Sequence, residues 1–134
     1  MATSDFRLST PPTDPRKREL WLEHAAGFIL FQDMRDYAIQ QIDESLNADS
    51  RAAAMKGIDD AVYGLMMILD GVTGALTNDS QRVNLRVAAE FIDCNNDETI
   101  LSLDLMDGDG MCMGYHGWLE NEYGDTRPFV ADED

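Results

Sequence analysis

The chain has 134 residues, which is the length of one compact domain and leaves no room for a second full one. It carries 26 Asp and Glu against 10 Lys and Arg, so its formal charge is -16 at pH 7 and its calculated pI is about 4.1. This charge repels the phosphates of nucleic acids and the anionic surface of membranes, and the sequence therefore excludes both as expected partners.

The composition indicates a folded protein of the cytoplasm. Hydrophobic residues make up 44% of the chain, but none of the apolar runs reaches the roughly 18 residues of a membrane span, and the polar start lacks the apolar centre of a secretion signal. The two cysteines, Cys94 and Cys112, are too few for a disulfide scaffold, so we expect reduced thiols. Residues 1–14 lack periodicity and contain two prolines, which predicts a flexible or surface-draped N-terminal arm before a single domain over 15–134.

A long helix is predicted at the start of this domain. Asp14 followed by Pro15 is typical of a helix N-terminus, and the helical pattern continues to about Leu46. The centre of this segment is apolar on every side and must be covered on more than one face. Because thirty helical residues would span about 45 Å, we expect a bend or break near Gly27.

A second helix is predicted to begin at Asp49 or Ser50 and to end near Gly71. Apolar side chains recur along one of its faces, at Met55, Ile58, Val62, Leu65, Met66 and Leu69. Mostly small side chains form another line, at Gly57, Ala61, Gly64 and Ile68. Glycine costs helix stability, so we expect a neighbouring backbone to pack closely on this line.

The period of the apolar residues changes to two in the second half of the chain, which indicates strands. The alternating positions are Val83, Leu85, Val87, Ala89 and Phe91, and then Leu101, Leu103 and Leu105. A hairpin over Arg82–Met106 buries both stripes on one face only if Phe91 lies opposite Leu101. In this register Arg86 can pair with Asp104. Helices followed by strands predict an α+β fold, with two N-terminal antiparallel helices packed on a small C-terminal antiparallel sheet.

The segment Asp107–Asp125 is unlike the rest, because it holds five of the ten glycines together with aromatic residues, a cysteine and a histidine. Its simplest interpretation is structural. A third strand over Met111–Tyr115 would follow an Asp-Gly turn, and Trp118 and Tyr123 would seal the edge of the core.

Three chemical interpretations compete with this one. Asp104, Asp107 and Asp109 could bind a hard cation, although the calcium-loop template fails because Leu105 and His116 fall where it needs carboxylates. The zinc ligands would be Cys112, His116, Cys94 and His24, without any Cys-x-x-Cys pair. Cys112 could also be a nucleophile, but no recognisable signature surrounds it. We therefore assign no catalytic residue, metal or cofactor.

Any localised function is expected between Asp107 and Trp118, where groups that can donate, accept or titrate lie beside aromatic surface. The candidate binding residues are Asp107, Asp109, Tyr115, His116 and Trp118. Replacing His116 or Asp109 should then abolish binding without changing stability.

Two stretches, Gly57–Leu76 and Leu103–Gly124, resemble segments of small uncharacterised bacterial proteins. The second contains Asp-Gly-Asp-Gly and then Gly-Tyr-His-Gly-Trp at Gly114–Trp118. The resemblance implies kinship and brings no known activity with it.

Two functions from different classes fit the sequence. The first is a non-enzymatic interaction module whose acidic surface binds a basic protein, as an immunity protein does when it blocks a toxin. The alternative is a small-ligand or metal-dependent enzyme with its site in residues 107–124. The acidity could also be an adaptation to a salt-rich cytoplasm, in which case salt would stabilise the fold.

Overall fold

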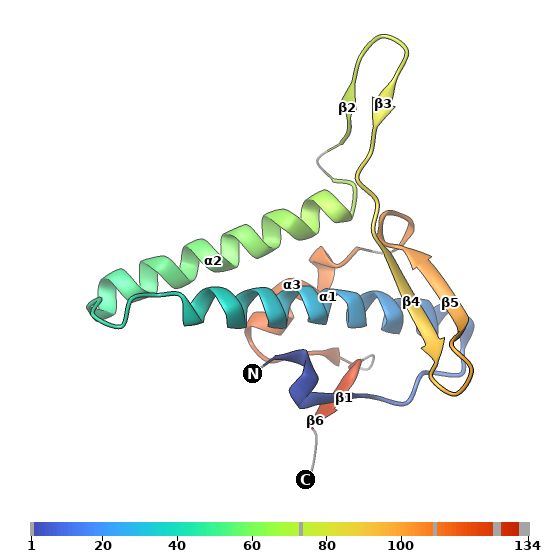
Figure 1. Ribbon diagram of the computed structural model, residues 1–134, viewed down its shortest axis with the longest axis horizontal. Coiled ribbons are helices and arrows are strands. Elements are labelled where there is room, and N and C mark those ends of the chain that lie inside the picture. Colours follow the sequence, from blue (N-terminus) through green and yellow to red (C-terminus); the bar gives the residue numbers. More distant parts are fainter. Residues whose placement is uncertain (1, 73, 109, 125–126, 132–134) are drawn as a thin grey trace.

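The computed structural model describes residues 2–72, 74–108, 110–124 and 127–131. Two antiparallel helices, α1 (Pro15–Gln40) and α2 (Ala48–Leu69), dominate the first half, and small antiparallel sheets follow (Figure 1). The other elements are η1 (Thr3–Asp5), β1 (Phe6–Leu8), β2 (Leu76–Thr77), β3 (Arg82–Val83), β4 (Ala88–Asp93), β5 (Glu98–Asp104), η2 (Leu105–Asp107), α3 (Cys112–Leu119) and β6 (Phe129–Ala131). The α+β prediction is confirmed. Within the described residues no helix combines the length and apolar character that crossing a membrane requires.

Helix α1 begins at Pro15 as predicted but ends at Gln40, six residues before Leu46. The chain leaves the helix because polar side chains bond to the backbone locally: the Asp43 carboxylate accepts the Ser45 amide at 2.9 Å. The expected break near Gly27 is wrong, since α1 is one continuous helix.

Helix α2 is capped by Asn47 rather than by Asp49 or Ser50, because the Asn47 side chain accepts the Ser50 amide at 2.8 Å. At the other end, Gly71 has φ +83° and the Val72 amide donates to the Met67 carbonyl at 2.9 Å. This is the left-handed glycine cap that the sequence predicts.

The predicted hairpin is confirmed in register and corrected in extent. Phe91 pairs with Leu101 and Ala88 with Asp104 in the β4–β5 sheet. The strand expected from Arg82 is interrupted, however: residues 82–83 form β3, which pairs with β2, and residues 84–87 belong to neither strand. The result is a separate β2–β3 hairpin that projects away from the helices (Figure 1).

The first and last described strands lie side by side, because β1 pairs antiparallel with β6 and Phe6 faces Ala131. Residues 1–14, which we expected to form a flexible or surface-draped N-terminal segment, include η1 and β1. The Thr3 amide and hydroxyl both donate to the Asp33 carboxylate, at 2.7 and 2.6 Å, so this segment contacts the middle of α1.

The core lies where α1, α2 and α3 meet. The apolar face predicted for α2 supplies three of its buried side chains, and the others come from α1, η2 and the glycine-rich segment: Phe31, Val62, Met66, Leu69, Leu105, Met111, Tyr115 and Trp118. The predicted third strand over Met111–Tyr115 is wrong, since this stretch belongs to helix α3 and its entry. The line of small residues on α2 was also misassigned, because nothing lies within 4 Å of a Cβ built at Gly57 or Gly64.

Candidate functional site

The predicted binding residues are divided between the two faces of α3 and the turn before it. Tyr115 and Trp118 are each only 3% exposed and belong to the core. His116 is exposed on α3, and Asp107 is exposed at the end of η2. Asp109 lies outside the described residues. The structure therefore leaves His116 and Asp107 accessible to a ligand and uses Tyr115 and Trp118 for packing.

The Trp118 ring explains one glycine of this segment, Gly114, and one glycine of α1, Gly27. A Cβ at Gly27 of α1 would overlap the outer edge of the Trp118 indole, and a Cβ at Gly114 would overlap its inner edge. The indole therefore occupies a slot between two helices that only glycine leaves open. The prediction that Trp118 seals the core is confirmed, although it does so from a helix.

Tyr115 connects α3 to α2. Its hydroxyl donates to the Asp59 carbonyl oxygen at 2.5 Å, and its ring lies edge-on to Phe31, with the centroids 5.9 Å apart. Burial, and then the nearby Asp59 carboxylate, raise the pKa of the phenol to about 12. Tyr115 is therefore a neutral hydrogen-bond donor that holds two helices together.

Helix α3 receives its N-terminal cap from a distant residue. The Asp70 carboxylate, at the end of α2, accepts the backbone amides of Met111 and Cys112 at 3.0 and 2.9 Å. Such a contact satisfies the free amides and places negative charge at the positive end of a helix. Sequence reasoning missed Asp70 because its partners are 41 and 42 residues away and carry no local signal.

The environment of Cys112 does not favour a nucleophile. Burial, and then the neighbouring Asp70 carboxylate, raise the pKa of the thiol to about 12. A reactive cysteine needs the opposite shift, since the thiolate is the attacking species. Cys112 therefore stays protonated at neutral pH and serves the packing of α3.

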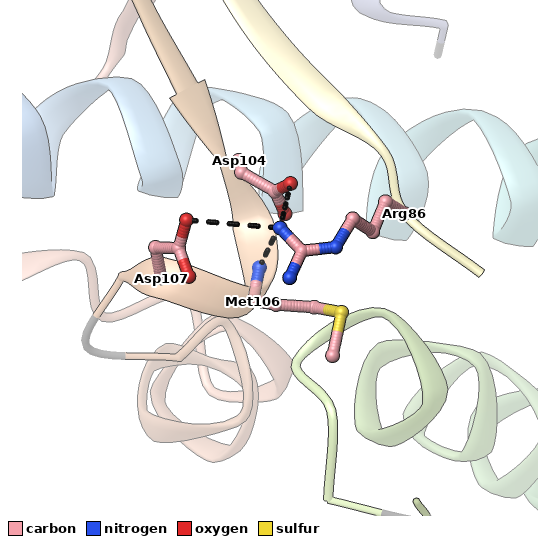
Figure 2. A network of polar contacts seen from close by, with 4 residues as sticks. All are labelled: Arg86, Asp104, Met106 and Asp107. Carbon is pink, nitrogen blue, oxygen red and sulfur yellow. Dashed lines mark hydrogen bonds and ion pairs between the residues drawn. The ribbon is translucent and has the colours of Figure 1, made fainter. Parts of the chain in front are cut away.

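The carboxylates of Asp104 and Asp107 face a guanidinium, as Figure 2 shows. Arg86 Nη1 lies 2.8 Å from Asp104 Oδ2 and 3.9 Å from Asp107 Oδ2, and the Met106 amide donates to Asp104 Oδ1 at 3.1 Å. The Met106 amide first, and Arg86 second, lower the pKa of Asp104. The predicted pairing of Arg86 with Asp104 is confirmed. The arginine occupies the position that a hard cation would need beside these two carboxylates.

The candidate metal ligands do not gather where the structure describes them. Among these residues, no group of three or more His, Cys, Asp or Glu side chains is arranged to hold an ion. Cys94 lies exposed in the β4–β5 turn, whereas Cys112 is half-buried in α3. The zinc hypothesis, like the cation hypothesis at Asp104 and Asp107, receives no geometric support.

Glu23 is a second residue that sequence reasoning missed. It is only 1% exposed, on the core side of α1, and a Cβ at Gly108 would overlap its carboxylate. The backbone entering the glycine-rich segment therefore passes directly over a buried acid. No periodicity could have paired Glu23 with Gly108, because they are brought together only by packing α1 against the end of β5.

Acidic residues predominate in one long stretch of the second half of the chain. Residues 87–126 contain ten Asp and Glu and neither Lys nor Arg. The exposed acids among them are Glu90, Asp97, Glu98, Asp107, Glu120 and Glu122. His116 lies beside this charge, and its ring stacks at a tilt on Tyr63, with the centroids 5.3 Å apart.

The site combines groups that hold the helices together with groups that face solvent. The buried Tyr115 and Glu23 and the partly buried Asp70 join helices or face backbone, and the exposed groups are carboxylates and one imidazole. Comparisons with protein-family models, with curated proteins and with solved structures find no match.

Proposed function

We propose that the protein is a non-enzymatic acidic interaction module that binds a basic protein, as an immunity protein binds a toxin. The observation that carries the proposal is the ten acids of residues 87–126, a stretch without Lys or Arg, with six of these acids exposed in the structure. Opposite potentials accelerate association and select partners by charge. A surface on which acids greatly outnumber cations is suited to that role.

The end of α3 is the part of this surface on which we expect the partner to bind. His116 and Glu120 are four residues apart, which places them on one side of the helix, and Glu122 follows in the next turn of the chain. All three are exposed, while the opposite side of α3 is fixed in the core by Tyr115 and Trp118. A rigid support of this kind lowers the cost of presenting charged side chains.

Affinity capture from the native cell, followed by measurement of the dissociation constant, tests the proposal. The test variant combines Glu120→Gln with Glu122→Gln, and the control combines Glu44→Gln with Asp49→Asn, which removes the same charge near the α1–α2 joint. We expect a basic partner whose affinity falls at least about tenfold, or about 1.4 kcal/mol, with the test variant and much less with the control.

Salt provides the second arm of the experiment. Binding should weaken as the ionic strength rises from about 0.05 to about 0.5 M, because exposed charges more than a Debye length apart are screened. His116→Ala should weaken binding while the melting temperature stays within a few degrees of the wild type. A partner of acidic or neutral surface, or equal losses with both double variants, would reject the proposal.

A further inference from the structure

The β2–β3 hairpin exposes the apolar side chains that a sheet normally buries. Leu76 and Val83 are directly paired across the two strands, yet they are 80% and 69% exposed. Val72 at the base of the hairpin and Leu85 beyond it are also exposed. We call residues 75–85 the arm; it extends away from the helical body (Figure 1).

An isolated arm of this kind is poorly stabilised. A two-stranded hairpin is marginal in water unless its apolar face packs against something. The arm contains only two paired positions on each strand, Leu76 with Val83 and Thr77 with Arg82. Another surface that packs on Leu76 and Val83 would therefore stabilise the arm.

The total surface of the chain supports the same conclusion. A compact monomer of 15.0 kDa has an accessible surface of about 7,000 Å², whereas this chain exposes 9023 Å². The difference of roughly 2,000 Å² exceeds the approximately 800 Å² per partner that a stable interface of standard size buries. The chain therefore has surface to spare for an assembly.

Charge indicates which partner covers the arm. The arm contains one acid, Asp79, and one base, Arg82, so it is neutral in a chain of charge -16. Two acidic copies can meet at such a neutral element with little repulsion. The same neutral element on each copy would meet the other, which is the self-complementarity that a two-fold interface requires.

We propose that the arm is a dimerisation element, in which Leu76 and Val83 pack against the same pair on a second copy of the chain. This inference goes beyond the binding of a basic protein and uses a different surface. The two also respond oppositely to salt, because screening weakens attraction to a basic partner but relieves repulsion between two copies of charge -16.

Analytical ultracentrifugation over a range of concentrations, at about 0.15 M and about 1 M salt, tests the dimer. We expect the wild type to reach twice the mass of the 15.0-kDa chain, and to do so at lower concentration in high salt. The double variant Leu76→Thr with Val83→Thr introduces residues that are common in strands but removes the apolar contact. It should raise the dissociation constant of the dimer at least tenfold. Ile100→Thr, which alters an exposed residue of β5, is the matched control and should dimerise normally.

Two variants that change the charge of the arm test the dimer independently, in case the Leu76 and Val83 changes disturb the hairpin. Asp79→Arg makes the arm positive, and Arg82→Asp makes it negative. Each variant alone should dimerise more weakly than an equimolar mixture of the two. The inference is overturned if the wild type stays monomeric up to high concentration in both salts, if the Leu76 and Val83 changes leave the dissociation constant unaltered, or if mixing restores nothing.

Discussion

The two hairpins of the second half of the chain share one sequence pattern but differ in what covers them. In β4–β5, Ala89 and Phe91 are half-buried over α1, and Phe91 meets the Trp21 ring edge-on, with the centroids 5.2 Å apart. In β2–β3, the paired Leu76 and Val83 are exposed. A period of two therefore shows that a strand has an apolar face, but not whether the same chain supplies its cover.

The molecule therefore has two parts. We call the part in which α1, α2 and α3 pack against one another the body, and it differs from the arm, whose apolar side chains face outward. The body is fixed by contacts between α1, α2 and α3, such as the Arg35–Asp59 ion pair at 2.6 Å and the packing of Trp118 against Gly27. The arm makes its pairs only within itself. Substitutions in the two regions should therefore affect different measurements.

The largest effect should come from Trp118→Ala. Removing this buried indole leaves a cavity between α1 and α3, and large aromatic truncations cost about 3 to 5 kcal/mol of unfolding free energy. Leu76→Ala, measured at a concentration where the chain is monomeric, should stay within about 0.5 kcal/mol. Urea denaturation compares the two, and a cost for Leu76→Ala similar to that for Trp118→Ala would contradict the division between body and arm.

Two glycine substitutions should have opposite signs. Gly27→Ala places a methyl group against the Trp118 indole, and overpacking of this kind typically costs about 1 to 3 kcal/mol. Gly64→Ala on the open face of α2 meets nothing within 4 Å, and should gain up to about 1 kcal/mol from helix propensity. Thermal unfolding of the two variants is the measurement. Stabilisation by Gly27→Ala would show that the indole has room to move away.

The features that the sequence predicted correctly depend on neighbouring residues, and those that it missed depend on residues far apart in the chain. The start of α1, the buried face of α2 and the pairing of Phe91 with Leu101 were predictable, because periodicity and register are properties of neighbouring residues. Helix α3 was missed because glycines suggested a strand and turns. Its cap, Asp70, and its anchor, the slot at Gly27, come from other elements.

The candidate site shows the same limit. The pairing of Arg86 with Asp104 followed from the hairpin register and is confirmed. The burial of Tyr115 and Trp118 could not be separated from the exposure of His116 until the segment was known to be helical. A strand would have alternated these side chains differently, since its period is two rather than 3.6.

Alkaline pH should destabilise the body through Tyr115 and Cys112. Burial raises the pKa of the phenol from 10.0 and that of the thiol from 9.0, each to about 12. The folded state thus favours the neutral forms, so their contribution is complete below about pH 9 and is lost as the pH rises toward 12. Urea midpoints measured across this range should fall steadily. Tyr115→Phe should flatten the decline, whereas Tyr37→Phe, at an exposed position, should not.

The smallest effect is expected at the joint between the two regions, where Arg86 links the end of the arm to Asp104. Both groups are accessible to water, so Arg86→Gln should lower the unfolding free energy only slightly, and added salt should reduce the difference further. The pKa of Asp104 is lowered from 3.8, so the contribution of the pair is complete above that pH and disappears as the pH falls through the lowered value. Wild type and Arg86→Gln should therefore converge in acid, as measured by urea denaturation at a series of pH values. A large loss that persists in acid would mean that Arg86 holds the base of the arm by packing of its aliphatic stem, and the boundary between arm and body would then lie beyond residue 86.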